Sequence, residues 1–328
     1  MLLFEPEFTI TPAILRLSAS VAEKAGRLSA RGGMETEPGL RRRTTACAVA
    51  GTLNVEAPGL TADTVLDVMD NRPAPVDMIA IREIKNACRA YGAIGDFDPL
   101  SLEHFCRVHA LLTEGLTPDG GQLRRDNARL FPEERQLYGA AAPVADRVQA
   151  LLKWLGDAGE ALTPPLASTI LHGELCVIHP FNSANGRFAR LWQAAYLCQC
   201  RGVYACVPFE AQLAANADRY YETLMRAING SEREPFIEFM LTCIDRSLDD
   251  VEARESVIGA ETSEYIRRLL NAMEPGVHYT ATAIMARLHL KSRENFRRNY
   301  MEPALAQGFV AMDDPEHPTN RNQRYSRK

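Results

Sequence analysis

The sequence predicts a mainly α-helical protein with a small C-terminal domain of different build, and three observations support this. Apolar residues recur about every 3.6 positions in eight separate segments, as they do in helices that bury one face. Strand signals are sparse and local. The charge balance changes from acidic to basic near residue 261.

The helical pattern is clear in the first segment, where Ile14, Leu17, Val21 and Ala25 fall on one face. The eight segments expected to be helical are residues 14–27, 78–93, 102–112, 144–155, 166–178, 187–200, 216–228 and 236–248. Residues 247–263 are rich in acids and small polar side chains, so we expect a domain boundary there.

Composition excludes several classes of protein. The chain has 328 residues with 37 Lys plus Arg against 42 Asp plus Glu, a net charge of −5 that argues against a general nucleic-acid coat. No apolar run approaches the roughly 18 residues that cross a bilayer. The opening MLLFEPEF carries acids where a signal peptide needs basic residues. We therefore expect a cytoplasmic protein with no membrane contact.

Two groups of residues are candidates for a zinc site. Cys198, Cys200 and Cys206 could bind zinc, or they could be reduced core thiols, since eight cysteines in this length are too dilute for a disulfide scaffold. His172 and Glu174 form an HxE, but no PCxxC follows, so we interpret both as structural.

The C-terminal part, residues 261–328, has eleven Lys plus Arg against eight Asp plus Glu, a net charge of +3 that leaves −8 for the rest. Helices are expected over 262–273, 280–288 and 292–307, followed by an apolar segment and a turn-rich PEHPTNRNQRY. This order predicts a winged helix-turn-helix, whose Arg293, Arg297 and Arg298 could face DNA. A charge of +3 is a weak electrostatic footprint, which favours a protein-contact or dimerisation module instead.

The candidate chemistry is concentrated between two helices, in the sequence HPFNSANGRFAR that begins at His179. Pro180 ends the first helix, and Asn182 or Ser183 can cap the second. Small residues at a helix start leave N–H groups open to an anion. Arg187 and Arg190 share a face beside them, so the site suits a polyphosphate. His179 can take a proton from an attacking hydroxyl.

This stretch resembles the motif HPFx(D/E)GNGRxxR of the Fic (Fido) family, with Ala184 in place of a glycine. The segments HALLTEGL, GQLRRD, VQALLKWL, ILHGELCVIHPF and DRYYETL resemble successive parts of the Fic core, so the likeness spans about residues 97–248. The tail resembles the winged-helix appendage of many bacterial members. The resemblance implies a mainly α Fic core with a short β-hairpin flap, plus the C-terminal winged helix.

The family implies protein adenylylation, the transfer of AMP from ATP to a Ser, Thr or Tyr hydroxyl of a target protein or of the enzyme itself, with Mg²⁺ on the phosphates. His179 is then the catalytic base. The phosphate-binding residues implied by the resemblance are Phe181, Asn182, Ser183, Ala184, Asn185, Gly186, Arg187 and Arg190. Tyr220 and Tyr221 match positions near the nucleotide base, although an aromatic pair in a helix is also typical of a core.

Residues 120–139 match the family's flap, which positions the target protein as an added strand. A surface loop is the alternative interpretation, and the sequence does not choose between them. A homodimer is also consistent with the family.

Ser183 departs from the motif, because most members have Asp or Glu there to hold Mg²⁺. A hydroxyl is a weaker ligand than a carboxylate for a hard dication, so metal binding should be looser unless Asp157 or another acid substitutes. This leaves three alternatives open: the reverse reaction (de-AMPylation), another phosphate donor, or a nucleotide-sensing pseudo-enzyme that acts through a DNA-binding winged helix.

The segment TLNVEAPGLT, residues 52–61, resembles the family's inhibitory-helix motif (S/T)xxxE(G/N), with Ala57 at the last position. The resemblance implies that Thr52 and Glu56 are inhibitory and that Glu56 pairs with Arg190, where it blocks the γ-phosphate. A surface glutamate on an ordinary helix is the alternative. The expected domains are an N-terminal helical region with the inhibitory helix (1–95), the Fic core (96–250) and the winged helix (260–328).

Overall fold

The computed structural model describes residues 6–31, 34, 38–125, 143–158, 161–229, 232–261, 264–274, 276–315, 317, 320 and 323–327, with the side chains of 255–261 and 264 left aside. The chain divides into two compact units, one of residues 1–35 and 41–250 and one of residues 36–40 and 251–328. The division at residue 250 falls inside the segment in which the sequence predicts a boundary.

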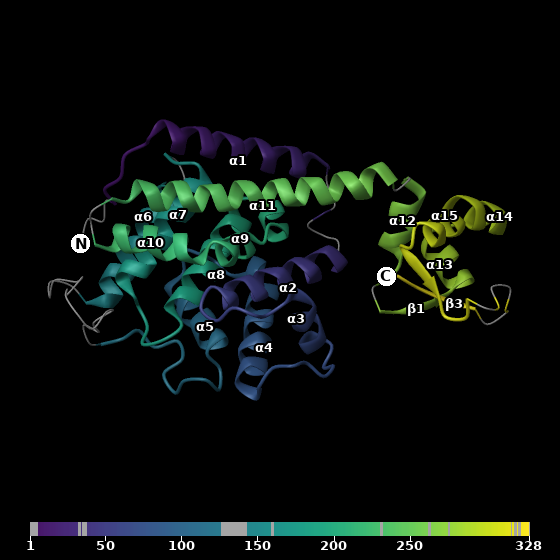
Figure 1. Cartoon of the computed structure of the whole chain (residues 1–328), viewed down its shortest axis with the longest axis horizontal. Helices are drawn as coiled ribbons and strands as arrows, with labels where there is room; N and C mark the ends of the chain where they lie inside the picture. The colour runs from purple at the N-terminus through teal and green to yellow at the C-terminus, as the bar shows by residue number, and fades with distance from the viewer. Residues whose placement is uncertain are drawn as a thin grey trace. The chain divides into compact units, whose positions relative to one another are not determined.

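Helices make up the first unit almost entirely, which confirms the predicted mainly α class (Figure 1). In chain order they are α1 (Pro12–Arg31), α2 (Pro38–Asn54), α3 (Ala62–Met69), α4 (Met78–Gly92), η2 (Ile94–Asp96), α5 (Leu102–Leu112), α6 (Val144–Ala158), α7 (Pro164–Ile178), α8 (Asn185–Cys200), η3 (Gly202–Cys206), α9 (Phe209–Ala215), α10 (Ala217–Ile228) and α11 (Glu234–Glu261), the last of which continues past residue 250.

The centre of this unit is the antiparallel pair α7 and α8. Twelve of the fifteen residues of α7 and ten of the sixteen of α8 are buried, because side chains on nearly every face of both helices are covered by neighbours. Helices α5, α6 and α10 pack against them. The HPFNSANG sequence runs from the end of α7 through the loop to the first residues of α8, so the most deeply buried helix pair holds the candidate site.

Several helix boundaries follow from local sequence. Helix α5 coincides with the predicted 102–112 because Ser101 caps it, its hydroxyl accepting a hydrogen bond from the His104 N–H at 3.3 Å. Thr61 caps α3, and Asp77 caps α4, in the same way. Periodicity did not predict α2, α3 or α9, and α11 is longer than the predicted 236–248.

Helices α1 and α11 lie side by side along one edge of the first unit (Figure 1). Lys24 on α1 forms ion pairs with Asp245 at 2.9 Å and with Asp249 at 2.6 Å, and the Ser20 hydroxyl donates to Asp245 at 2.7 Å. These contacts join the start of the unit to its end.

The second unit combines short helices with a small sheet. It contains α12 (Glu264–Ala272), β1 (His278–Thr280), α13 (Ala281–Arg287), α14 (Arg293–Asn295), η4 (Phe296–Met301), α15 (Glu302–Ala306), β2 (Val310–Met312) and β3 (Arg324–Arg327). The strands form an antiparallel sheet in the order β1-β3-β2, with Tyr325 opposite both Tyr279 and Met312. Ile266, Leu269, Ile284, Phe296 and Tyr300 belong to a core of its own.

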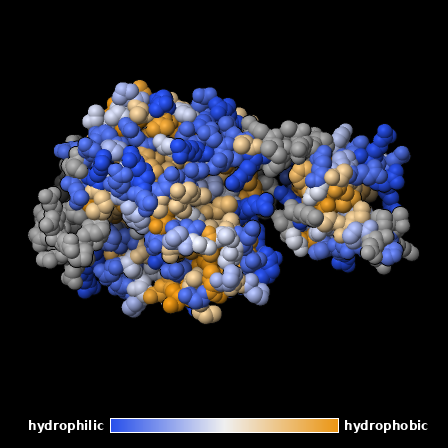
Figure 2. Space-filling model, viewed as in Figure 1, coloured by the Kyte–Doolittle hydropathy of each residue, from blue (hydrophilic) through white to orange (hydrophobic). Residues whose placement is uncertain are grey.

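Polar residues cover most of the visible face, with apolar residues in separate groups (Figure 2). Met78, at the start of α4, has 77% of its surface exposed and is followed by the exposed Ile79. Within the described residues, no helix combines the length and the apolar character that a bilayer crossing requires.

Candidate active site

The loop between α7 and α8 is held in a strained conformation at both ends. His179 ends α7 with φ 48° and ψ 62°, and Ala184 precedes α8 with φ 56° and ψ 19°, so both residues are left-handed. A non-glycine residue pays about 1 kcal/mol for this conformation. The left-handed conformation of these two residues turns the chain between α7 and α8, with His179 at the end of one helix and Ala184 before the start of the other.

The start of α8 has no side-chain cap among the described residues. We expected Asn182 or Ser183 to cap the helix, and this prediction is wrong, since the cap residue is Ala184, which has no side-chain acceptor. The first N–H groups of α8, beginning at Asn185 and Gly186, therefore keep their donors for an anion.

Asn185 braces the loop from within. Its side-chain oxygen accepts a hydrogen bond from the Phe181 N–H at 2.9 Å, and its amide nitrogen donates to the Phe181 carbonyl at 2.8 Å. Both ends of the amide are thus occupied by one backbone residue. In this structure the Asn185 side chain shapes the loop, which leaves the backbone N–H groups at the start of α8 as the donors that an anion could meet.

His109 on α5 supports the loop from the other side. Its ring stacks on that of Phe181, with centroids 3.6 Å apart and planes 5° from parallel. The Gly121 N–H donates to His109 Nδ1 at 2.9 Å, so the proton lies on Nε2, which donates to the Ser183 carbonyl at 3.0 Å. Burial lowers the pKa of His109, which keeps the ring neutral.

Arg124 holds the backbone around His179 in place. Its Nε donates to the His179 carbonyl at 2.6 Å, Nη2 donates to the Ile178 carbonyl at 3.0 Å, and its own N–H donates to the Pro180 carbonyl at 2.9 Å. Three hydrogen bonds from one residue fix three consecutive carbonyls.

The His179 imidazole is set up as a neutral base. Burial, followed by the charge of Arg124, lowers the pKa of His179 to about 4, and a hydrogen bond with the Cys176 backbone opposes the shift. The ring is therefore unprotonated near neutral pH and can accept a proton.

Glu56 lies over the start of α8 and pairs with both arginines of the motif. Its Oε1 is 2.7 Å from Arg190 Nη2, and its Oε2 is 3.2 Å from Arg187 Nε. A side chain added at Gly186 would come within 3.3 Å of the same carboxylate. A carboxylate thus occupies the space beside the helix start that a phosphate would use.

The segment that carries Glu56 is docked by several contacts. Arg190, of which 1% is exposed, donates from Nε to the Thr52 hydroxyl at 2.8 Å and from Nη2 to the Thr52 carbonyl at 3.0 Å. The Tyr221 hydroxyl donates to the Val55 carbonyl at 3.4 Å. Gly51 lies so close to the backbone of α9 that a Cβ there would be 2.5 Å from Ala211 N.

Arg187 has a second acidic partner that the sequence did not predict. Its Nη1 donates to Glu83 Oε1, on α4, at 2.6 Å. Glu83, Arg187, Ala184 and Thr52 line one small pocket between α2, α4 and the start of α8. The pocket brings α4 into the candidate site.

Tyr220 and Tyr221 lie in different surroundings. Tyr220 is 1% exposed, and its hydroxyl is 2.9 Å from Nε2 of the buried His172, whose Nδ1 is 2.8 Å from Gln193 Oε1. These contacts favour the core interpretation of Tyr220. Tyr221 is 42% exposed and is the one of the pair that is open to a ligand.

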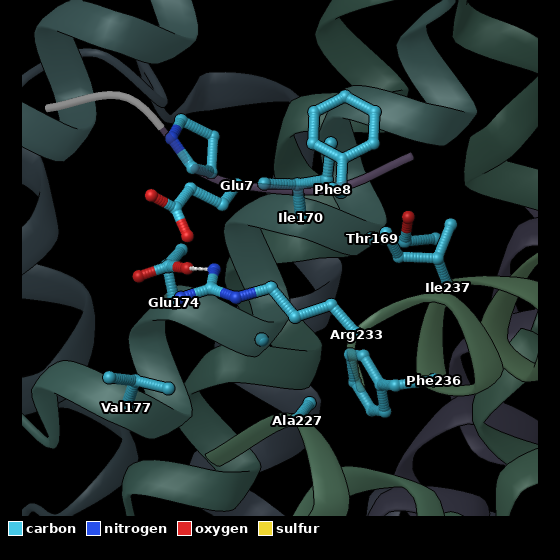
Figure 3. Close-up of a pocket in the computed structure, with 12 residues that line it drawn as sticks. Glu7, Phe8, Thr169, Ile170, Glu174, Val177, Ala227, Arg233, Phe236 and Ile237 are labelled. Carbon is cyan, nitrogen blue, oxygen red and sulfur yellow. Dashed lines mark hydrogen bonds and ion pairs between the residues drawn. The ribbon is translucent and has the colours of Figure 1, made fainter. Parts of the chain in front are cut away.

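Glu174 serves a different pocket, on another face of α7 (Figure 3). It is buried and forms an ion pair with Arg233, while Glu7 and Phe8 of the N-terminal segment lie above this pair. Burial raises the pKa of Glu174, and the charge of Arg233 opposes the shift. His172 and Glu174 thus have separate partners, as their structural interpretation predicts.

Metal ligands are few. Within the described part of the chain, no group of three or more His, Cys, Asp or Glu side chains gathers for a metal ion, which removes the zinc hypothesis for Cys198, Cys200 and Cys206. Ser183 is exposed on the loop. The acid that contacts the loop is Asp119, whose Oδ2 accepts from Asn182 Nδ2 at 2.6 Å.

The expected flap, residues 120–139, is described only at its start. Residues 120–125 form no strand, and residues 126–142 lie outside the described residues, so the flap stays a prediction.

The geometry defines a mainly helical protein with a candidate anion site on its central helix pair, and two family models match the chain. A model of the Fic/DOC family matches residues 99–197, and a model described as the C-terminal domain of Fic-like proteins (filamentation induced by cAMP) matches residues 264–326. A solved Fic family protein from Desulfovibrio desulfuricans is 30% identical with a TM-score of 0.70, over 99% of this chain and 98% of that one. The chain belongs to the Fic family.

Other relatives are more distant. Fic-1 of C. elegans has a TM-score of 0.60 over 74% of this chain and 73% of that one, at 17% identity, which shows the fold alone. The protein adenylyltransferase Fic of Aedes aegypti is 29% identical over 160 residues, 46% of this chain and 29% of that protein. The protein of the same name from Nematostella vectensis is 36% identical over 90 residues, 27% of this chain and 20% of that protein. The chain thus matches less than a third of each of these two relatives.

Proposed function

We propose that this protein is a protein adenylyltransferase that is held inactive by Glu56. The observation on which the proposal depends is the loop between α7 and α8. It has His179 at one end and, at the other, the start of α8, which has no side-chain cap and is followed by Arg187 and Arg190. Similar proteins of Aedes aegypti and Nematostella vectensis are named protein adenylyltransferases, which supports the choice of an adenylyl group as the group transferred.

The reaction moves one proton and one adenylyl group. A hydroxyl of the target protein gives its proton to the neutral His179 imidazole while its oxygen attacks the α-phosphorus of ATP. The bond from the α-phosphorus to the bridging oxygen of the β-phosphate breaks, and pyrophosphate leaves. Burial and the charge of Arg124 lower the pKa of His179 and so keep the base neutral before attack, and the hydrogen bond with the Cys176 backbone opposes them.

The remaining residues bind and orient phosphate. The N–H groups at the start of α8 stabilise negative charge, and they need no rearrangement because Asn185 and His109 already fix the loop. Arg187 and Arg190 are suited to the β- and γ-phosphates once their carboxylate partners leave.

Mg²⁺ would be held weakly by this chain. Ser183 offers a hydroxyl, and Asp119 contacts the loop through Asn182, so the residues that the structure describes supply little of a hard-cation site. When bound, the ion neutralises phosphate charge.

Ser183 also favours a second candidate, in which the same site uses another phosphate donor or removes AMP from a modified protein. A site without a strong metal ligand has less reason to prefer a Mg²⁺-bound triphosphate. Strand β1 lies between α12 and α13 and pairs with β3, and β2 and β3 follow the last helix, an arrangement that is consistent with a winged helix. We propose that this unit contacts protein, since Arg297 already pairs with Glu302 at 3.3 Å. A cytoplasmic location is part of this proposal.

The experiment compares the wild type with Glu56→Gly, Glu56→Gly/His179→Ala and Glu56→Gly/His104→Ala during incubation with ATP labelled at the α-phosphate. His104 is a histidine outside the site and serves as the matched control. We expect Glu56→Gly to label itself faster than the wild type, the His179 variant to lose the label and the His104 variant to keep it. Equal labelling with and without His179 would refute the proposed role of the base.

A further inference from the structure

Glu83 on α4 is the closest partner of Arg187. The Arg187 Nη1 to Glu83 Oε1 distance is 2.6 Å with the geometry of a hydrogen bond, whereas the contact from Arg187 Nε to Glu56 is 3.2 Å long and lacks that geometry. The side chains of Arg187 and Glu83 are 19% and 28% exposed, so the pair is largely shielded from water. Each motif arginine therefore has a carboxylate of its own, Glu83 for Arg187 and Glu56 for Arg190.

The two carboxylates together occupy both edges of the Arg187 guanidinium group that could bind a phosphate. A guanidinium binds a phosphate in bidentate fashion through its Nε–Nη2 edge or its Nη1–Nη2 edge. Glu56 lies at Nε and Glu83 at Nη1, so each edge already has an acid on it. Removal of Glu56 alone would still leave Arg187 paired.

The charge count leads to the same conclusion. Arg187 and Arg190 contribute +2, and Glu56 and Glu83 contribute −2, so these four side chains are neutral together. A triphosphate would meet a charge of +2 only if both acids were absent or turned away. Glu83 also lines the pocket shared with Thr52 and Leu53 of α2, so it lies within reach of the inhibitory segment.

We propose that Glu83 is a second inhibitory carboxylate, which withholds Arg187 from phosphate while Glu56 withholds Arg190. This inference rests on the proposed function, because it assigns a second inhibitory contact to the same phosphate site. It predicts that the inhibition is graded, with one acid removed giving partial and two acids removed giving full access to phosphate.

The test measures the affinity for sodium tripolyphosphate, without metal, by isothermal titration calorimetry. The variants are Glu83→Gln, Glu56→Gly and their double variant, with Glu114→Gln as the control, since Glu114 also pairs with an arginine of α4 but touches neither motif arginine. We expect Glu83→Gln to tighten binding about tenfold in the Glu56→Gly background, as loss of one nearby negative charge predicts. Glu114→Gln should leave the affinity within about twofold of its parent.

A cycle with Arg187 makes the test specific. In an Arg187→Met background, Glu83→Gln should have no effect on tripolyphosphate affinity, because the arginine that it releases is gone. Glu83→Ala should behave as Glu83→Gln does, which separates loss of the charge from a local distortion.

Two results would overturn the proposal. If Glu83→Gln leaves the affinity unchanged or weakens it, Glu83 orients Arg187 toward phosphate instead of withholding it. If even the double variant binds no tripolyphosphate, neither acid guards a phosphate site. Failure of AMP transfer with tighter tripolyphosphate binding would refute the proposed function and leave this inference standing, and transfer without tighter binding would do the reverse.

Discussion

Substitution of Gly51 tests whether the docking of α2 controls the site, because it moves α2 without removing any charged side chain. A Cβ at this position would be 2.5 Å from Ala211 N and from the Glu210 carbonyl carbon, and 2.7 Å from the Glu210 oxygen. Carbon atoms in contact prefer about 3.5 Å, so α2 has to move by roughly 1 Å to accept an alanine. Such overpacking costs about 1–3 kcal/mol.

That cost falls on the docked state, in which Glu56 reaches the arginines. If the released state is free of the clash, its population rises by about 5- to 150-fold, which is what 1–3 kcal/mol amounts to. We expect Gly51→Ala to increase self-labelling from ATP by a factor in this range, up to the rate of Glu56→Gly. In the Glu56→Gly background the same substitution should add little.

Gly92→Ala is the matched control, because Gly92 ends α4 and a Cβ there meets nothing within 4 Å. It should leave the labelling rate at the wild-type value. If Gly51→Ala lowers the melting temperature but leaves the labelling rate unchanged, while Glu56→Gly raises it, the docking of α2 does not control the site and this reasoning is wrong.

Four further predictions concern the loop and the residues around it. Arg124→Met removes two side-chain hydrogen bonds to the 178–179 carbonyls, each worth about 1 kcal/mol or more, so transfer by the Glu56→Gly form should fall at least tenfold in kcat, whereas Arg125→Met should not change it. Because the pKa of His179 is lowered from 6.5 to about 4, the base stays neutral on acidification, and the rate should hold down to about pH 5, whereas an acidic limb centred at 6.5 would contradict the assignment. The stability of the fold should depend on pH over the same range. The pKa values of His172 and His179 are lowered in the folded protein, so the unfolded chain binds more protons and the free energy of unfolding should decrease as pH falls from 6.5 toward 4. A free energy of unfolding, measured by urea melts, that stays constant over this range would contradict this. Ser183→Glu in the Glu56→Gly form should lower the Mg²⁺ concentration that gives half-maximal transfer, while Ser183→Gln should not. Equal Mg²⁺ profiles for the two variants would show that Ser183 does not limit Mg²⁺ binding.

The sequence predicted the central part of the site well. Pro180 after an apolar helix marks the end of α7, and Arg187 and Arg190 at a spacing of three share a face, as their common partner Glu56 shows. The resemblance also led to the contact between Glu56 and Arg190, across 134 residues of chain. These features depend on local patterns or on a motif.

The features that were missed depend on tertiary contact. Nothing in the sequence of α4 distinguishes Glu83 from an ordinary surface acid, since its partner is 104 residues away. His109 and Arg124 fall within HALLTEGL and GQLRRD, segments that resemble the Fic core, so a signal for them was present but carried no role. Helix α2 lacks an apolar stripe, so periodicity does not predict it. It packs instead through close backbone contacts such as that of Gly51 with α9.

The central claim is that the site transfers the AMP part of ATP once Glu56 is removed. The most direct measurement incubates Glu56→Gly with ATP labelled at the α-phosphate and, in parallel, at the γ-phosphate, and then separates the protein from free nucleotide. We predict that the protein retains the α label and not the γ label. Retention of the γ label, or of neither, would contradict the account.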